Sequence, residues 1–467
     1  MTKHGDQTFE RCMKCTICND YCPMLAVNPL FPGPKSAGPD GERYRLKDGR
    51  FFDNNLKYCL NCKRCELACP SGVHIADLVQ LARLEKAPDY PRLRDVLLGS
   101  TDIVGKLAVP MAPLVNNALK MSFVQNTLDY TLGVDAHRSF PDYAKQSFVR
   151  WFRKEAAARQ AEFTLQVSYF HGCYVNYNYP QLGRDLVRVL NAVGVGVQLL
   201  EDERCCGVAL LANGMKKQAA RHARTNLKAV RASLDKGLPV LATGSTCVLT
   251  LREEYPNVLG IDNSDVKEGI TLATRWLWEA LEAGRIQLPF RPDYKKRIAY
   301  HAPCHLEKLG WSIYSIELLK RIPGVEFVML DSACCGISGT FGFKKEYYHY
   351  SQQVGEKLFK SIREAKPDLV ATDCETCKWQ IEMSTGFEVA HPISILADAL
   401  QEKGLGSPSP FCSATGIRTR ISALRGPRTK PLFDSAIGFG TAKIHQSFII
   451  PKKTLLLPFC PAFPDGR

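Results

Sequence analysis

Two short cysteine-rich stretches constrain the fold of this chain more than any other feature of its sequence. They read CMKCTICNDYCP and CLNCKRCELACP, so the same spacing occurs twice and a proline follows each last cysteine. Two-residue spacers let a short loop wrap three thiolates around one [4Fe–4S] cluster, and the fourth cysteine, beside proline, usually binds the other cluster. The spacing therefore predicts two clusters, the first held by Cys12, Cys15, Cys18 and Cys69 and the second by Cys59, Cys62, Cys65 and Cys22.

A zinc site is the alternative for these cysteines. Zinc normally takes pairs of ligands within a tetrahedral set of four, whereas three closely spaced cysteines followed by one favour iron–sulfur binding. Residues 23–58, between the two stretches, are rich in Pro and Gly and predict a loop. Helical spacing of Ile75, Leu78, Leu81 and Leu84 predicts a helix next, and we expect the small cluster-binding domain to span residues 1–95.

The second half of the chain contains a long repeat in which two adjacent cysteines precede glycine. One copy contains SYFHGCYV, QLLEDERCCG and PVLATGSTC, and the other contains IAYHAPCHL, VMLDSACCG and LVATDCETC. The spacings also agree, because Cys173 lies 32 positions before Cys205 and Cys304 lies 30 positions before Cys334. A duplication of this length predicts two similar units, which we place at residues 161–290 and 291–403.

Each unit is predicted to have an α/β fold with a mostly parallel sheet. Residues 239–243 and 369–372 are short apolar runs typical of buried strands, and residues 183–194 and 347–366 have helical periodicity. The cysteines follow strand ends, and parallel sheets bind ligands beyond the carboxyl ends of their strands. The expected fold is therefore a small α-rich, ferredoxin-like domain with two [4Fe–4S] clusters, followed by two repeated α/β cysteine-rich (CCG) units.

The two units offer different sets of candidate ligands. The second offers Cys304, Cys334, Cys335, Cys374 and Cys377, and the first offers Cys173, Cys205, Cys206 and Cys247. Gly244 stands at the position that corresponds to Cys374, so the first set is short of one thiolate. Buried free cysteines are the alternative, which suits isolated ones such as Cys412 and Cys460 but explains a duplicated CCG poorly. Four nearby histidines could be ligands, proton donors or satisfied loop residues: His171, His301, His305 and His391.

Residues 96–160 are predicted to form a helical connector that could contact a membrane surface. Phe148, Trp151 and Phe152 lie among basic residues, as in an interfacial helix, but packing against the α/β units would give the same pattern. No run approaches the ~18 apolar residues of a membrane span, and the amino terminus shows no signal-peptide core. Because its 19 cysteines are clustered in a large chain, we expect a reducing, cytosolic compartment.

The net charge of +14 is unevenly distributed along the chain. Residues 404–467 contain nine basic and two acidic side chains, so half of the excess lies in the last 64 positions. This tail lacks repeats and sustained periodicity, which predicts little order. A nucleic-acid-binding arm is the alternative, but no aromatic or binding motif accompanies the basic residues, so no nucleic-acid partner is expected.

The two CxxCxxCxxxCP stretches followed by paired CCG units resemble the iron–sulfur subunits of membrane-associated respiratory dehydrogenases, including those of glycolate and lactate oxidation and of heterodisulfide reductase. Three segments, NPLFPGPKSAGPDGERYRLKDG, LKYCLNCKRCELACPS and STCVLTLREEYP, are similar to the iron–sulfur subunit family of anaerobic glycerol-3-phosphate dehydrogenases. The likeness covers about residues 8–400. It implies that the eight cysteines of the two stretches hold [4Fe–4S] clusters. The five cysteines of the second unit correspond to those that hold a non-cubane cluster in heterodisulfide reductase relatives.

The resemblance further implies an electron-transfer and membrane-anchoring subunit, peripheral on the cytoplasmic side of the inner membrane. Such a subunit works with a flavoprotein dehydrogenase subunit and passes electrons to membrane quinone. The chain shows no Gly-rich dinucleotide fingerprint, because AVGVGVQLL has Leu199 where the third glycine belongs, so no flavin is expected in it. The alternatives are a catalytic disulfide or quinone reductase acting through the second CCG unit, a glycolate or lactate oxidase-type iron–sulfur subunit, and a scaffold stabilised by its clusters.

Overall fold

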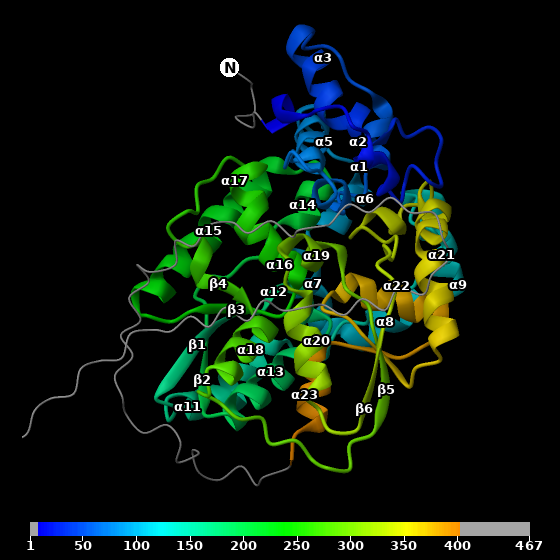
Figure 1. The fold of residues 1–467 in the computed structure, drawn as a ribbon. Coiled ribbons are helices and arrows are strands. Elements are labelled where there is room, and N and C mark those ends of the chain that lie inside the picture. Colours follow the sequence, from blue (N-terminus) through cyan, green and yellow to red (C-terminus); the bar gives the residue numbers. More distant parts are fainter. Residues whose placement is uncertain (1–7, 402–467) are drawn as a thin grey trace, which may run out of the picture. The chain divides into compact units, whose positions relative to one another are not determined.

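The N-terminal part of the structure is built from short helices. The computed structural model describes residues 8–401, so the predictions for residues 404–467 concern residues outside this range. Its first elements are η1 (Thr8–Arg11), α1 (Ile17–Asp20), α2 (Gly33–Lys35), η2 (Ser36–Asp40), α3 (Gly41–Lys47), η3 (Asn54–Tyr58), α4 (Arg64–Leu67) and α5 (Ile75–Glu85). Helices α1, α2, α3 and α5 lie together (Figure 1), and α5 confirms the helix predicted through Leu78.

The prediction that residues 23–58 form a loop is wrong in part. The segment contains α2, the π-helical turn η2, α3 and the 3-10 turn η3. Pro39 lies inside η2, and a Cβ atom at Gly38 would lie 2.8 Å from Cγ2 of Ile75. These turns therefore pack directly against α5, and this tertiary contact overrides the local tendency of Pro and Gly to interrupt helices.

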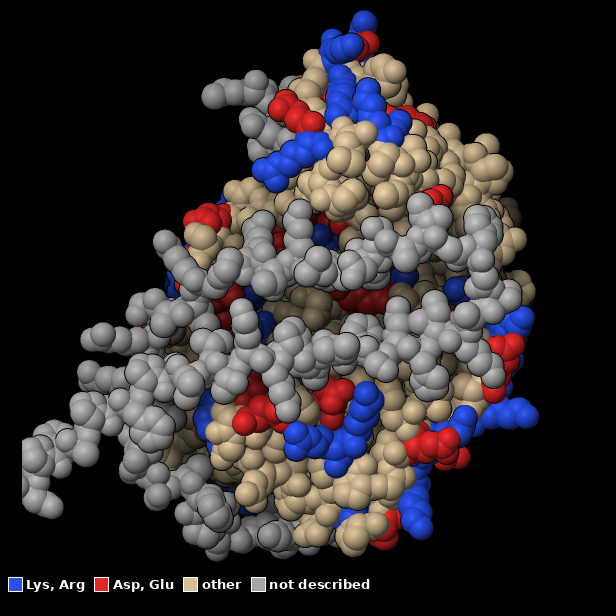
Figure 2. All heavy atoms as spheres, in the orientation of Figure 1, with Lys and Arg blue, Asp and Glu red and all other residues tan. Residues whose placement is uncertain are grey.

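Basic side chains gather over α3, as Figure 2 shows at the upper tip of the molecule, and this helix carries Arg43, Arg45 and Lys47. Arg43 donates to the carbonyl oxygen of Phe9 at 2.9 Å and pairs with Asp40, also at 2.9 Å. The N-terminal domain thus presents a basic surface next to the segment that leads into the first cysteine stretch.

A series of helices connects this domain to the α/β units. It comprises α6 (Leu93–Gly99), α7 (Thr101–Ala108), η4 (Val109–Met111), α8 (Ala112–Lys120), α9 (Ser122–Leu132), α10 (Phe148–Trp151), η5 (Phe152–Ala156) and α11 (Ala157–Gln160). The domain boundary proposed after residue 95 falls inside α6. No helix among residues 8–401 is long and apolar enough to cross a membrane.

The aromatic residues of α10 and η5 belong to the protein core. Phe148 and Phe152 are 0% and 5% exposed, and the ring centroid of Phe148 lies 5.7 Å from that of Tyr169 in the first sheet. Trp151 packs against the same core, with the guanidinium of Arg184 5.0 Å from its ring centroid. Packing against the α/β unit, rather than an interfacial membrane helix, therefore explains this segment.

The first CCG unit has a four-stranded parallel sheet in the order β2-β1-β3-β4. Its strands are β1 (Leu165–Phe170), β2 (Val195–Leu199), β3 (Val240–Ala242) and β4 (Ile270–Leu272). Its helices and turns are α12 (Gly172–Tyr177), α13 (Pro180–Ala192), α14 (Val208–Ala212), α15 (Lys216–Asp235), α16 (Ser245–Leu249), η6 (Thr250–Glu254), α17 (Tyr255–Asn257), η7 (Lys267–Gly269) and α18 (Ala273–Glu282).

The second CCG unit repeats this topology, with a parallel sheet in the order β6-β5-β7-β8. Its strands are β5 (Lys296–Tyr300), β6 (Val325–Met329), β7 (Leu369–Ala371) and β8 (Val389–Ala390). Its helices are α19 (Cys304–Leu309), α20 (Ser312–Lys320), η8 (Phe341–Phe343), α21 (Tyr348–Ala365), α22 (Glu375–Thr385) and α23 (Pro392–Ala399). Strands β3 and β7 and helices α13 and α21 confirm the elements predicted from apolar runs and periodicity.

One hydrophobic core joins the two sheets. Leu186 and Leu190 of α13 lie in it together with Ile393 and Leu396 of α23, and all four are fully buried. A bridge between Phe290 and Leu400 also ties the start of the second unit to its end. The two units therefore form an α/β body that shares its apolar interior, in agreement with the predicted fold class.

Candidate functional site

The two cysteine-rich loops have the same unusual backbone conformation. Lys14 and Thr16 in the first loop have φ angles of 60° and 64°, and Asn61 and Lys63 in the second have 51° and 63°. These positions match, because each pair lies two and four residues after the first cysteine of its stretch. A non-glycine residue in such a region costs roughly 1–3 kcal/mol and persists only when its surroundings fix it. Both loops are thus held in one shape, which suits wrapping around a cluster.

The structure brings the eight cysteines of these loops together as two sets. We name them site A (Cys12, Cys15, Cys18 and Cys69) and site B (Cys22, Cys59, Cys62 and Cys65). Burial, followed by the charges of the other three site A thiolates, raises the pKa of Cys18 to about 11. Burial likewise raises the pKa of Cys65, and Glu66 and the other three site B cysteines add to the effect. These are the sets that the spacing paired crosswise between the loops, and the individual ligand assignments stay predictions.

The arrangement favours clusters over single zinc ions. Within residues 8–401, no three His, Cys, Asp or Glu side chains converge tightly enough to hold one metal ion. In a cubane each thiolate binds a different iron, so its ligands stand farther apart than those around one zinc ion. Thiolates are also the soft donors that iron–sulfur clusters use.

In the first unit, three stretches meet beyond the carboxyl ends of β1, β2 and β3. They supply the first CCG site, which consists of Cys173 in α12, Cys205 and Cys206 after β2, and Cys247 in α16. A Cβ atom at Gly172 would lie 3.4 Å from Sγ of Cys247, so these stretches are in contact. Hydrogen bonds from Cys173 and Cys206 lower the pKa of Cys205 well below its usual value.

In the second unit, the equivalent stretches follow β5, β6 and β7. The second CCG site consists of Cys304 at the start of α19, Cys334 and Cys335 after β6, and Cys374 and Cys377 at the start of α22. The Sγ atoms of Cys335 and Cys377 lie 3.2 Å apart. Hydrogen bonding from Cys377 lowers the pKa of Cys374 to about 6. The predicted meeting of distant cysteines at one sheet edge is therefore observed in both units.

His301 gives a second observation that fits a bound cluster at the second CCG site. It is 1% exposed, and neither ring nitrogen has a hydrogen-bond partner. Burial lowers the pKa of His301 to about 4, so the ring is neutral. Because buried polar groups almost always have partners, an orphaned imidazole beside five thiols fits a site that is completed by a further group.

The other three histidines have partners in the fold. His305 bridges Oγ1 of Thr246 and the carbonyl oxygen of Asn61, at 3.1 Å each. His391 contacts the carbonyl oxygen of Thr243 and caps α23, and His171 contacts the carbonyl oxygen of Gly172 at 2.9 Å. These contacts favour the structural interpretation for these three residues.

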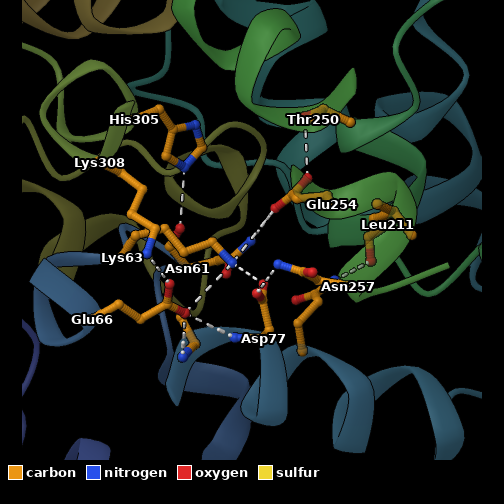
Figure 3. A network of polar contacts seen from close by, with 12 residues as sticks. Asn61, Lys63, Glu66, Asp77, Leu211, Thr250, Glu254, Asn257, His305 and Lys308 are labelled. Carbon is orange, nitrogen blue, oxygen red and sulfur yellow. Dashed lines mark hydrogen bonds and ion pairs between the residues drawn. The ribbon is translucent and has the colours of Figure 1, made fainter. Parts of the chain in front are cut away.

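A buried charge network, which the sequence did not reveal, fixes the loop of site B to the α/β units (Figure 3). The Lys63 ammonium pairs with Asp77 and lies 3.9 Å from Glu66 and 3.8 Å from Glu254. Asn61 donates to Glu254 at 2.9 Å, although 193 positions separate them. Lys63 stands between two cysteines of the second stretch, which is a signal for its importance, but its partner in the first CCG unit could not be found from spacing.

One large cavity connects three of the four cysteine sites. Its volume is about 1070 Å³, and Cys59 and Cys62 of site B line it together with all nine cysteines of the two CCG sites. Its remaining wall is largely apolar and includes Leu98, Val104, Val115 and Leu119 from the connector helices. An apolar molecule in this cavity would lie next to the second CCG site and against α7 and α8.

Fold and sites together define the class of protein: a two-cluster ferredoxin-type domain fused to duplicated cysteine-rich units. Residues 8–73 match the family described as 4Fe-4S dicluster domain, and residues 167–252 and 298–382 match the one described as Cysteine-rich domain, CCG. Iron–sulfur clusters are therefore the cofactors of this chain.

Comparison with curated proteins identifies the particular family. The chain is 54% identical over 397 residues to the iron–sulfur subunit of the anaerobic glycerol-3-phosphate dehydrogenase of Escherichia coli strain K12, covering 85% of this chain and 100% of that protein. It belongs to this family. More distant relatives include the glycolate oxidase iron–sulfur subunit of E. coli K12, at 25% identity over 85% of this chain and 96% of the relative. Another belongs to the dihydromethanophenazine:CoB–CoM heterodisulfide reductase of Methanosarcina barkeri, at 24% identity over 84% of this chain and 94% of the relative.

Proposed function

We propose that this chain is the electron-transfer and membrane-anchoring subunit of an anaerobic glycerol-3-phosphate dehydrogenase complex. In this role it passes electrons from a flavoprotein subunit to membrane quinone at the cytoplasmic face of the inner membrane. When bound, iron–sulfur clusters accept and donate single electrons. The observation that supports the proposal best is the order of the sites: Cys15 of site A is exposed, whereas Cys62 of site B packs in one apolar cluster with Cys334 of the second CCG site.

The exposed end of this series suits the entry of electrons. Around Cys15, Met13 and Tyr21 are 66% and 54% exposed, so a partner can approach site A closely. The basic residues of α3 belong to the same domain. A flavoprotein surface with acidic side chains would complement them and would bring its flavin near site A.

Replacing Cys62 by serine should abolish quinone reduction by the assembled complex and leave dye reduction by the flavoprotein partner unchanged. Cys62 stands between the exposed site A and the second CCG site, so its loss interrupts the path and not the oxidation of substrate. Both activities are measured anaerobically with purified complex. The control is Cys412→Ser, because Cys412 lies outside every cysteine motif. Quinone reduction at the wild-type rate in Cys62→Ser would refute the proposed path.

The connector helices α7, α8 and α9 support the membrane end of the proposal, because they are apolar on two sides. Val104, Val115 and Leu119 line the cavity. The opposite set is exposed: Ile103 (59%), Leu107 (70%), Met111 (54%), Leu114 (64%) and Phe123 (77%). Residues 103–128 contain two charged side chains, Lys106 and Lys120, and both are basic. A helix that is apolar all round normally has apolar neighbours on every side, and a membrane surface with anionic lipids would supply them here.

Charges placed on this surface should weaken membrane binding. We expect the double variant Leu107→Glu, Phe123→Glu to bind vesicles of phosphatidylethanolamine and phosphatidylglycerol at least tenfold more weakly than wild type, measured by flotation. Ile313→Glu is the control, because Ile313 is also exposed (44%) but lies on α20 of the second CCG unit. Equal flotation of the double variant and the control would exclude α7–α9 as the attachment surface.

The cavity also supports the alternative of a catalytic reductase acting through the second CCG site. A disulfide in the cavity would lie next to the five thiols of that site. The name of the M. barkeri relative describes part of a heterodisulfide reductase. A change in the electron paramagnetic resonance spectrum on adding a disulfide, and none on adding quinone, would favour this alternative over quinone reduction.

A further inference from the structure

The missing cysteine of the first CCG site raises the question of what stands in its place. Gly244 and Cys374 are equivalent, since each is the N-cap residue of a helix whose first turn carries the last cysteine of its unit, Cys247 or Cys377. Gly244 has φ −76° and ψ 113°, an extended conformation that any residue adopts. Backbone conformation therefore does not explain the glycine.

Space explains it. A Cβ atom at Gly244 would lie 2.8 Å from Oε1 and 3.2 Å from Oε2 of Glu375. The carboxylate of the second unit thus occupies the region where a cysteine side chain of the first unit would begin. A larger residue at position 244 would have to displace it.

The two units meet at this point, which is why a residue of one reaches the site of the other. The backbone N–H of Ser245 and its hydroxyl both donate to the carbonyl oxygen of Asp373, at 3.2 Å and 2.9 Å. Oγ1 of Thr246 lies 3.9 Å from Sγ of Cys374. Glu375 is the first residue of α22 and follows Asp373 and Cys374 directly, so its side chain extends across this contact.

The Glu375 carboxylate is also free to bind. Within residues 8–401, no side chain forms a hydrogen bond or an ion pair with it, and it lines the same cavity as Cys173 and Cys247. Glu203, the other acidic side chain near this site, is already engaged, because it accepts hydrogen bonds from the backbone N–H groups of His171 (3.1 Å) and Gly172 (2.7 Å).

We propose that Glu375 supplies an oxygen ligand to the first CCG site in place of the absent fifth cysteine. The site would then consist of four thiolates from the first unit and one carboxylate from the second: Cys173, Cys205, Cys206, Cys247 and Glu375. Carboxylate is an established ligand of non-haem iron, and this exchange keeps five anionic donors. The first unit therefore binds a cluster of its own, with a mixed sulfur and oxygen ligand set. The inference goes beyond the electron path proposed above, which uses only the second CCG site.

The test uses the full-length protein, purified anaerobically and reconstituted with iron and sulfide. Iron is counted, and the clusters are distinguished by Mössbauer and electron paramagnetic resonance spectra. Cys247→Ser defines the spectral component of the first CCG site, and Cys377→Ser defines that of the second. Glu375→Gln should lose the component that Cys247→Ser loses, with roughly the four iron atoms of one cluster, and should keep the other. The control is Glu388→Gln, because Glu388 is an exposed glutamate of the same unit.

A rescue variant makes the test independent of folding. Gly244→Cys combined with Glu375→Ala creates five thiolates in the first unit, and it should restore the iron and shift the first-site spectrum toward that of the second site. Three outcomes would overturn the proposal. They are wild-type spectra in Glu375→Gln, a change confined to the component that Cys377→Ser removes, and an iron content in Cys247→Ser equal to that of wild type.

Discussion

Replacing Lys63 by methionine should destabilise the contact between the ferredoxin-type domain and the α/β body by about 3–5 kcal/mol, the usual cost of removing one partner from a buried ion pair. The side chain of Lys63 is 2% exposed, and three carboxylates surround it: Asp77, Glu66 and Glu254. Burial alone would lower the pKa of Lys63, but these carboxylates raise it above its ordinary value. Methionine fills the same space and leaves three buried acidic groups without their cation.

Site B should be lost together with this contact. Lys63 has a left-handed backbone and lies directly after Cys62, so the network also fixes the shape of the cluster-binding loop. We expect a lower urea concentration at the midpoint of cluster release, followed by the visible absorbance of the clusters. Lys308→Met is the matched control, because Lys308 pairs with Glu66 at 2.8 Å but its side chain is 22% exposed. Its effect should be about 1–2 kcal/mol. Similar midpoints for Lys63→Met and wild type would show that the network does not hold the loop.

Gly336→Ala should disrupt the second CCG site far more than Gly207→Ala disrupts the first. Both glycines close a CCG motif in the left-handed region, with φ 85° and 93°. At Gly336 a Cβ atom would lie 2.0 Å from the carbonyl oxygen of Ser351 in α21, a backbone atom that cannot move independently. At Gly207 the nearest atom would be 3.5 Å away, in Ala219. Alanine therefore meets backbone strain at both positions and a steric clash only at Gly336.

The expected costs are about 1 kcal/mol for Gly207→Ala, from the left-handed backbone, and about 2–5 kcal/mol for Gly336→Ala, from strain and overpacking together. Because Gly336 follows Cys334 and Cys335 directly, its displacement should also remove the spectral component of the second CCG site. Iron content and Mössbauer spectra of both variants measure this. Equal iron loss in the two variants would contradict the steric argument.

The sequence predicted best what depends on short spacings and on local patterns. The crosswise grouping of Cys22 with Cys59, Cys62 and Cys65 followed from a spacing of a few residues, and the strand ends near Cys304 and Cys374 followed from short apolar runs. The repeat predicted the common topology, because two copies of one pattern must fold alike.

What the sequence did not predict depends on contacts between distant residues. Residues 23–58 form helical turns because they pack on α5, and their composition alone predicts a loop. Phe148 could have faced a membrane or a core, and its burial became evident only with the sheet in place. Glu254 and Glu375 complete sites in other parts of the chain, and no local pattern marks an acidic residue for such a role.

The exposure of Cys15 has a consequence for how this protein tolerates air. A partner's electrons enter where a cysteine ligand is accessible, and dioxygen reaches the same place from solvent. Cys65 of site B and the paired cysteines of both CCG sites are buried, and Cys15 is exposed. Oxidative damage should therefore begin at site A and disconnect the chain from its electron donor, while the deeper sites remain intact and can be used again once that cluster is rebuilt.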